Sequence, residues 1–480
     1  MFRELPELFV TDYQALLFTK YHYSVTPESG LFAFEDSRLS ALFGEDQIRR
    51  CIMNEKSTED RTASLDSLPQ ELVDTIANNL EGDIPTLKSC SLTCRKLSSG
   101  TGRALLFKRH LLRSSYDCDK LLDAPEYILQ HIKVLCIPSA TDPPYEGLFN
   151  RPSFHQLMAS LGPLELMIDS LLWSELNDGA RQALSDHSFR RIHIEYSDFQ
   201  SVADICFFLR SSHGLETLIL PSLGIEKTMM PHWPYQAGPS VSHLTLHSVD
   251  GRLKLFESIV KIPSCPISVN KLRVLNVHVS HAEDLGLLQG VLAMTKELQE
   301  LKVSHEYLIS GSGVPTVADL KLTSIESLTV EMSDYDNLDC PVLYDTPLFR
   351  WWCEVWANTS TTCMNKLVIE ASVTRIGNRE LDTTLWSQMA RALSKPPWKT
   401  LSTVTIVIHA QNTRSVEALI QASYIKKIED VMTALTETHS VEVSVTLKYP
   451  APECDWGPEE GDSDEDSWGW VSVLADEEHN

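Results

Sequence analysis

The sequence predicts an α/β protein, in which a short helical unit precedes a long series of strands and helices and an acidic tail. Its 480 residues are 43 % apolar and include 20 Gly and 24 Pro. This is a globular composition, and the length corresponds to about three domains. Short aliphatic runs recur between residues 132 and 447, and helix candidates lie between them. The regular recurrence of these runs predicts the α/β class.

Composition divides the chain into five segments. Residues 1–56 mix aromatic and acidic residues without a clear period and receive no functional assignment. Residues 57–64 are polar and predict a linker. Residues 65–113 form the helical unit, and residues 114–448 hold the strand–helix series. Residues 449–480 are acidic and rich in Gly, Ser and Pro, which predicts a disordered tail.

Charge is distributed unevenly along the chain. With 41 Lys and Arg against 66 Asp and Glu, the formal net charge is −25, which argues against general nucleic-acid binding. Residues 451–480 contribute eleven acidic residues and no Lys or Arg. Between Asp83 and Asp117 the opposite holds, because seven basic residues occur there without an acid: Lys88, Arg95, Lys96, Arg103, Lys108, Arg109 and Arg113. This basic segment suits an acidic partner surface.

Features of membrane and secreted proteins are missing from the sequence. No stretch reaches the roughly 18 apolar residues that a membrane helix needs, and residues 1–6 do not resemble a secretory signal. The eleven cysteines are scattered from Cys51 to Cys454 without CxxC pairs, which is typical of reduced thiols. We therefore expect a cytoplasmic or nuclear protein with no membrane partner.

Three short helices are expected in the helical unit. Ser67 and Gln70 match a capping box at the start of the first helix, and Pro69 fits its first turn. An apolar stripe follows at helical spacing: Leu72, Val73, Ile76, Ala77 and Leu80. Asp83 is expected to cap a second helix that carries Leu87, Cys90, Cys94 and Leu97 on one face, and Gly100 and Gly102 to break the chain before a third. So small a unit usually completes its core against a partner.

These residues carry a resemblance to a known family. The motif Leu68-Pro69-x-Glu71-Leu72-x-x-x-Ile76-x-x-x-Leu80, the phrase SCSLTCRKL at 89–97 and LLFKRHLL at 105–112 resemble the F-box, especially that of mushroom-type fungi. The resemblance covers about 45–50 residues. Many F-boxes have Trp after the Cys-Arg dipeptide, where this chain has Leu97. The simpler alternative is a helical hairpin whose stripe is internal core.

The resemblance implies a partner and a set of contact residues. F-boxes dock on the Skp-type linker subunit of a cullin–RING ubiquitin ligase, and through it on a cullin. The residues implied in docking are Leu68, Pro69, Glu71, Leu72, Ile76, Leu80, Leu87, Cys94, Arg95 and Lys96. An exposed apolar stripe with nearby positive charge agrees with such an anchor.

The strand candidates follow the pattern L-x-x-L-x-L, with other aliphatic residues allowed, at ten places. Their first residues are separated by 29, 28, 26, 26, 31, 26, 27, 39 and 37 positions. The triplets are Ile132/Leu135/Ile137, Leu161/Leu164/Leu166, Phe189/Ile192/Ile194, Leu215/Leu218/Leu220, Val241/Leu244/Leu246, Leu272/Leu275/Val277, Leu298/Leu301/Val303, Ile325/Leu328/Val330, Met364/Leu367/Ile369 and Leu401/Val404/Ile406. A last run, Val441/Val443/Val445/Leu447, alternates strictly.

A strand plus a helix about every 27 residues is similar to a leucine-rich repeat. The Asn or Cys that this family places after its last leucine is absent, and Asp169, Ser197, Leu223, Val249 and Ser280 stand there. The resemblance therefore implies an irregular leucine-rich-repeat-like solenoid after the F-box unit. A non-repetitive α/β domain with one sheet is the alternative.

The period of two in a strand predicts a surface. It places Leu218 and Leu220 inward and Thr217, Ile219 and Pro221 on the opposite face. Applied to the other runs, it gives an outer face with charges of both signs, which includes Arg191, His193, Glu195, His243, His247, His278, Lys302 and Glu331. Strands lie about 4.8 Å apart, so these side chains form one surface. Mixed charge favours a protein target, and a merely solvated face is the simpler interpretation.

Nothing in the sequence predicts catalysis. His243 and His247 lie about 13 Å apart along a strand, too far to share one metal ion. Cys90 and Cys94 lack a second ligand pair, so core packing is expected for them. No hydrolase, zinc-protease, kinase or nucleotide-binding motif occurs. We expect no catalytic residues, no metal and no cofactor.

Two insertions exceed the repeat length. Residues 221–240 contain four prolines and two glycines, which predict a long loop. Residues 334–356 include Trp351, Trp352 and Trp356, which favour buried packing over a partner anchor.

The sequence therefore predicts a substrate-recognition adaptor of a cullin–RING ligase that binds an unknown protein target. The first alternative is a scaffold protein that uses the repeat surface and joins no ligase. The second is an enzyme that uses the histidine face with a metal.

Overall fold

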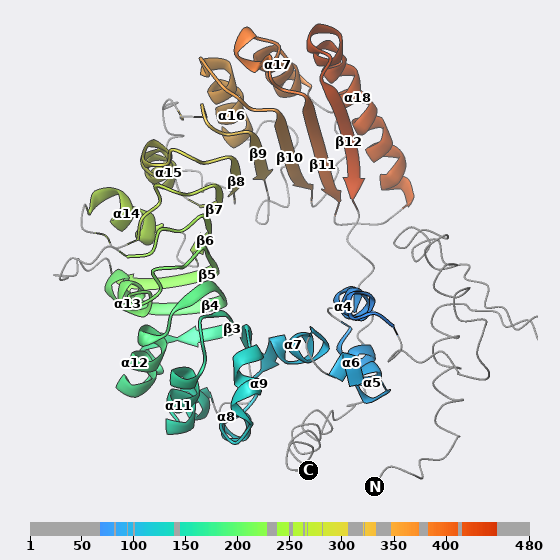
Figure 1. The fold of residues 1–480 in the computed structure, drawn as a ribbon. Helices are drawn as coiled ribbons and strands as arrows, with labels where there is room; N and C mark the ends of the chain where they lie inside the picture. Colours follow the sequence, from blue (N-terminus) through green and yellow to red (C-terminus); the bar gives the residue numbers. More distant parts are fainter. Residues whose placement is uncertain are drawn as a thin grey trace, which may run out of the picture.

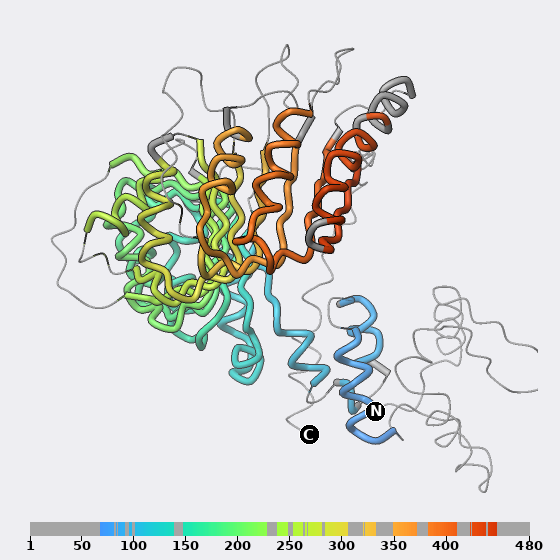
Figure 2. The backbone as a smooth tube through the Cα atoms, turned by 90° about the horizontal axis from the view of Figure 1, so that it is seen from above, coloured from blue at the N-terminus to red at the C-terminus, as the bar shows by residue number. Residues whose placement is uncertain are grey.

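The computed structural model describes residues 68–448, except 81–82, 94, 99–100, 139–144, 228–237, 249–252, 263–264, 266, 281, 306–319, 321, 333–346, 374–382 and 411–414. Ser67 and the segments predicted at 1–56, 57–64 and 449–480 lie outside these residues. The described chain is an α/β protein with a 12-stranded parallel sheet. A separate group of helices lies beside the sheet, as Figures 1 and 2 show.

The helical unit consists of α4 (Gln70–Asn79), α5 (Ile84–Thr93), α6 (Arg95–Ser98) and α7 (Thr101–Lys108), coloured blue in Figure 2. Asp83 caps α5 as predicted, because its carboxylate accepts from the backbone N–H of Thr86 at 3.2 Å and from the Thr86 hydroxyl at 2.8 Å. The unit has a small core of its own, made of Val73, Ala77, Leu87, Cys90 and Leu97.

Gly102 was expected to interrupt the chain, but it lies inside α7. A Cβ atom at this position would stand 1.7 Å from the carbonyl oxygen of Leu97. The glycine therefore lets α7 approach the backbone of α6, which is a packing role and not a break.

The strands of the sheet occur in sequence order and all pair in parallel, from β1 to β12. Their bounds are β1 (Arg109–Leu111), β2 (Val134–Ile137), β3 (Leu164–Leu172), β4 (Phe189–Ser201), β5 (Thr217–Lys227), β6 (His243–Ser248), β7 (Val274–Val279), β8 (Glu300–His305), β9 (Ser327–Met332), β10 (Lys366–Val373), β11 (Thr403–Ala410) and β12 (Glu442–Lys448).

Helices connect these strands and cover one face of the sheet. They are α8 (Ser115–Leu122), α9 (Glu126–His131), α10 (Tyr145–Phe149), α11 (Pro152–Ser160), α12 (Asp178–Asp186), α13 (Val202–Phe208), α14 (Lys254–Lys261), α15 (Ala282–Met294), α16 (Pro347–Asn358), α17 (Thr384–Leu393) and α18 (Ser415–His439), with short 3-10 turns at Trp173–Glu175 and Pro396–Trp398. In Figure 1 the strands line the inner side of an open arc and the helices its outer side. We call the strand-lined side the inner face.

The predicted aliphatic runs align across the sheet. The middle residue of one run pairs with the middle residue of the next, as in Leu218 with Leu244 and Leu244 with Leu275. The same row continues through Leu301, Leu328, Leu367 and Val404 to Val443. From Leu218 to Val404 these side chains are almost fully buried, so the row forms the spine of the large core.

One run is shifted by two residues from its prediction. Leu166, which was expected to be the third residue of its run, pairs with the middle residue Ile192. Leu164 pairs with Phe189, and the register shifts between Leu164 and Glu165. A β-bulge of this kind cannot be read from an apolar pattern, because Leu161 also fits the pattern.

A loop was predicted from Pro221, but β5 continues through this residue to Lys227. The register between β5 and β6 is irregular between Leu220 and Leu223. This irregularity accommodates a residue without an N–H group. Residues 228–237 of the predicted loop lie outside the described residues.

The tryptophans of α16 are packing residues, as the sequence favoured. Trp351, Trp352 and Trp356 are buried between α16 and the sheet. The indole N–H of Trp398 donates to the carbonyl of Trp356 at 3.2 Å, which links the 3-10 turn at Pro396–Trp398 to helix α16. None of the helices in the described ranges combines the length and the apolar character that crossing a membrane requires.

The helical unit is joined to the sheet without a spacer. Strand β1 follows α7 directly, so the sheet begins inside the range predicted for the helical unit. The backbone N–H of Lys133 donates to the carbonyl of Lys108 at 2.8 Å. The guanidinium of Arg103 in α7 stacks over the ring of Tyr127 in α9, 4.8 Å from its centroid. These contacts couple the two parts.

Candidate protein-interaction surfaces

Helix α4 carries apolar residues on two sides. Val73 and Ala77 are 2 % and 0 % exposed and belong to the small core. Pro69 is exposed, and Leu72 and Ile76 are half-buried and lie outside that core. We call these three residues the α4 face. Within the described chain this apolar surface is partly accessible, whereas Val73 and Ala77 of the same predicted stripe are buried.

Leu68 and Leu80 lie at the boundary between the two sides of α4. Both are half-buried and pack against the small core. Leu87 was predicted among the docking residues, and the structure contradicts this because the side chain is fully buried in the core. It shares this core with Val73 and Ala77 of α4.

Lys96 is another predicted docking residue with a structural partner. Its Nζ donates to the carbonyl oxygen of Leu68 at 2.6 Å, which ties α6 to the start of α4. Glu71 is exposed at the first turn of α4. Cys94 and the side chain of Arg95 lie outside the described residues.

The basic segment is only partly available to a partner. Lys96 and Arg103 make the contacts given above. Arg109 and Arg113 are exposed, and Lys108 is half-buried. Positive charge is therefore concentrated where the helical unit meets the sheet.

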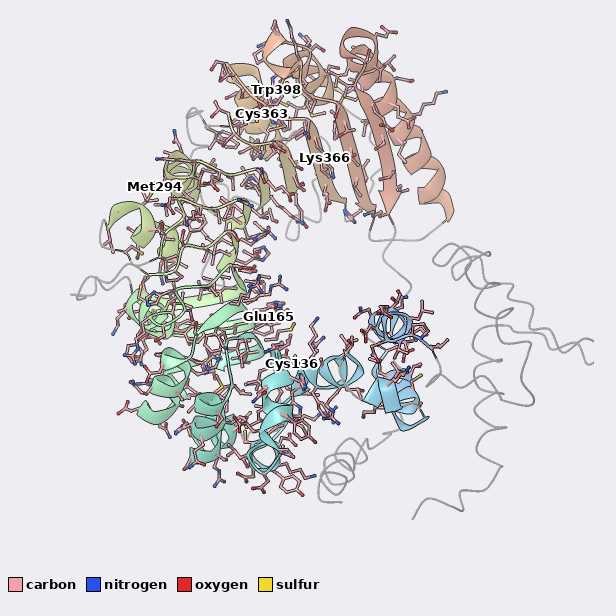
Figure 3. The ribbon with its side chains drawn as sticks, viewed as in Figure 1. Cys136, Glu165, Met294, Cys363, Lys366 and Trp398 are labelled. Atoms are coloured by element: carbon pink, nitrogen blue, oxygen red, sulfur yellow. The ribbon has the colours of Figure 1, made fainter. Side chains whose placement is uncertain are left out.

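The predicted outer-face residues lie on the inner face of the arc. All eight are exposed or half-buried on β4, β6, β7, β8 and β9: Arg191, His193, Glu195, His243, His247, His278, Lys302 and Glu331. Figure 3 shows Glu165 and Lys366 on the same side, and Met294 on the side of the helices.

Charged side chains on this face pair with each other. Arg191 lies 3.3 Å from the carboxylate of Glu165 on the neighbouring strand. His193 lies 2.9 Å from Glu195 two positions along the same strand. These pairs are substantially exposed, so each contributes little to stability. Basic side chains, which donate hydrogen bonds, therefore lie next to carboxylates, which accept them, on this face.

Four polar residues form a row across β6 to β9. The rings of His247 and His278 are 4.9 Å apart between centroids. His278 is in register with Ser304, and Ser304 with Glu331. The Ser304 hydroxyl donates to the Glu331 carboxylate at 3.0 Å. We call these residues the histidine row. The sequence did not pair His247 with His278 because strand register is invisible in it.

Glu331 is held as a carboxylate at the end of this row. Burial raises its pKa, but hydrogen bonds from Lys302 and Ser304 and the charges of Lys302 and His247 outweigh burial and lower the pKa. The Lys302 ammonium lies 2.8 Å from Glu331. Glu331 is therefore an ionised acceptor at neutral pH.

Metal binding was one alternative for the histidine face. Among the residues that the structure describes, no group of three or more His, Cys, Asp and Glu side chains is arranged to hold a metal ion.

The two surfaces differ in chemistry. The α4 face is apolar, whereas the inner face is polar with charges of both signs.

Neither the models of known protein families nor the curated proteins match this chain. Function is therefore inferred from these two surfaces.

Proposed function

We propose that this protein is a non-enzymatic substrate receptor of a cullin–RING ubiquitin ligase. Helices α4–α7 act as an F-box that docks on a Skp-type linker subunit. The parallel sheet and its helices act as an irregular leucine-rich-repeat-like domain that binds a protein target. One observation carries the proposal: the α4 face is accessible on a helical unit that already has a core of its own.

An accessible apolar face of this kind suits the groove of a helical partner. Pro69, Leu72 and Ile76 follow one another at spacings of three and four residues, so they lie along one side of α4. Arg109 and Arg113 at the junction add exposed positive charge, which favours association with an acidic partner.

The direct junction between α7 and β1 supports the same function. A ligase receptor must hold its target near the charged ubiquitin conjugate, and the rate then comes from effective concentration. Here the stacking of Arg103 on Tyr127 and the bond between Lys133 and Lys108 limit motion between the helical unit and the sheet. The inner face would present the target in a fixed direction.

The docking experiment uses the full chain and a purified Skp-type linker protein. The test variant is Pro69→Ala with Leu72→Ala, and the control is Asn78→Ala with Asn79→Ala, which are exposed residues of the same helix. We expect the wild type and the control to retain the linker and the test variant to lose it. Circular dichroism checks that all three are folded.

Equal recovery of the linker by the wild type and the test variant would overturn the docking role of the α4 face. A wild-type chain that retains no linker but copurifies with another protein in stoichiometric amount would favour the scaffold interpretation. If the linker docks as proposed, the target can be identified by comparing the ubiquitinated peptides of cells that contain the protein with those of cells that lack it.

A further inference from the structure

Strand β12 is the last strand of the sheet at one end of the arc, as Figure 1 shows. Within the described chain it pairs with β11 on one side and with no strand on the other. Its core-side residues Val443, Val445 and Leu447 are half-buried, although they pack against the large core. An edge of this length and character is a template for pairing with another strand.

The other end of the sheet is protected. Strand β1 is three residues long and begins with the exposed Arg109. Short, charged edge strands discourage pairing between molecules. Strand β12 has seven residues, so it offers a longer edge.

One hydrogen bond shows which backbone N–H and C=O groups of β12 face β11 and which face the open edge. The N–H of Glu442 donates to the carbonyl of Ser402 at 2.8 Å, so Glu442 faces β11. Backbone groups alternate between the two edges of a strand. The N–H and C=O groups of Val443, Val445 and Leu447 therefore face the open edge.

We propose that β12 pairs with β12 of a second copy of this chain, in antiparallel direction and centred on Val445. In this register Glu442 lies opposite the partner's Lys448, and Val443 lies opposite the partner's Leu447. Ser444 lies opposite the partner's Thr446, and Val445 faces itself.

The sequence of β12 is complementary to itself in this register. The order is Glu-Val-Ser-Val-Thr-Leu-Lys, so opposite charges meet at both ends, hydroxyls meet hydroxyls and aliphatic groups meet aliphatic groups. Residues directly opposite in an antiparallel pair share a face, so Val443, Val445 and Leu447 would all meet on the core side. With Val445 at the centre, Val443, Val445 and Leu447, whose backbone groups face the open edge, form the hydrogen-bonded pairs of the new ladder.

The pairing is isologous, so it closes as a twofold dimer and does not extend into a filament. It joins the two sheets into one and places two inner faces in a single assembly. A target with two binding segments would then gain affinity through effective concentration. The dimer does not depend on the proposed ligase function.

Charge reversal on the full chain tests the register. In Glu442→Lys, like charges meet at both ends of the paired strands, and the same holds in Lys448→Glu. We expect each variant alone to weaken the dimer by about tenfold or more, measured by sedimentation equilibrium. Both residues are exposed, so circular dichroism should show unchanged folding.

Two further samples separate this register from a general charge effect. An equimolar mixture of Glu442→Lys and Lys448→Glu restores opposite charges at both ends, and so does the double variant. Both are expected to regain the wild-type dimer. A full-length wild type that remains monomeric, or a dimer that both single variants leave unchanged, overturns the proposal.

Discussion

The indole N–H of Trp352 donates to Nε2 of His305 across 3.1 Å and joins helix α16 to strand β8 inside the core. The two rings meet edge to face, with centroids 5.9 Å apart. Because Nε2 is the acceptor, His305 is a neutral imidazole with its proton on Nδ1. Burial, with a smaller contribution from the charge of His278, lowers the pKa of His305 to about 3.

Acid should therefore destabilise the fold through His305. Its pKa is about 3 in the folded chain and 6.5 ordinarily, so the unfolded chain takes up the proton first as the pH falls. The stability is fully present above pH 6.5 and is lost progressively toward pH 3. Between pH 7 and pH 5 the loss is about 2 kcal/mol. The free energy of unfolding in urea at both pH values measures it.

His305→Gln should reduce this loss, because the amide oxygen still accepts from Trp352 and does not titrate in this range. His193→Gln on the inner face serves as the control, because it makes the same substitution outside the core. The same loss of stability in wild type and His305→Gln would show that other groups, such as the buried His110 and His187, dominate acid unfolding.

Gly102 gives a second prediction. In Gly102→Ala the new Cβ collides with the backbone of Leu97, which cannot move without separating α6 from α7. We expect the helical unit to lose about 1–3 kcal/mol. Gly286→Ala is the matched control, because Gly286 lies in α15 with open space around it, and there alanine should stabilise the helix by about 0.5–1 kcal/mol. Hydrogen exchange in α4–α7 separates the two effects, and equal protection in both variants would contradict the close packing.

Much of the fold is predictable from the sequence because buried strands repeat a simple pattern. Leu218 and Leu220 are buried as the period of two requires, and their equivalents align over most of the sheet. The exceptions have local causes. The run that contains Leu166 pairs two residues away from its predicted register beside a bulge, and an irregular register allows Pro221 inside a strand. Apolar patterns do not encode either feature.

The candidate surfaces were harder to predict than the fold. Helical spacing identified the stripe of α4, but it did not separate Leu72 on the surface from Val73 in the core. The contact between His247 and His278 depends on register between strands 31 residues apart in sequence. His305 could have been recognised by its place on the core side of β8, two residues beyond the buried Val303.

Truncation of Leu87 should destabilise the helical unit much more than truncation of Leu72. Leu87 is fully buried in the small core, so Leu87→Ala should cost about 2–5 kcal/mol in the stability of the helical unit. Leu72 is half-buried outside that core, so Leu72→Ala should cost less than about 1 kcal/mol. Hydrogen exchange of α4–α7 measures both. A large loss of protection in Leu72→Ala would mean that the α4 face belongs to the core.

Exposed ion pairs should contribute little to stability. Lys302 and Glu331 are 38 % and 35 % exposed, and Arg190 and Glu216, which lie 3.1 Å apart, are 67 % and 56 % exposed. Double-mutant cycles with Lys302→Met and Glu331→Gln should give a coupling below about 1 kcal/mol, and Arg190→Met with Glu216→Gln should give a coupling near zero. A coupling of several kcal/mol at either pair would show that the ion pair stabilises the fold. Small couplings would agree with the proposed role of the inner-face charges in binding a partner, because paired charges that add little stability can still set the orientation of a bound protein.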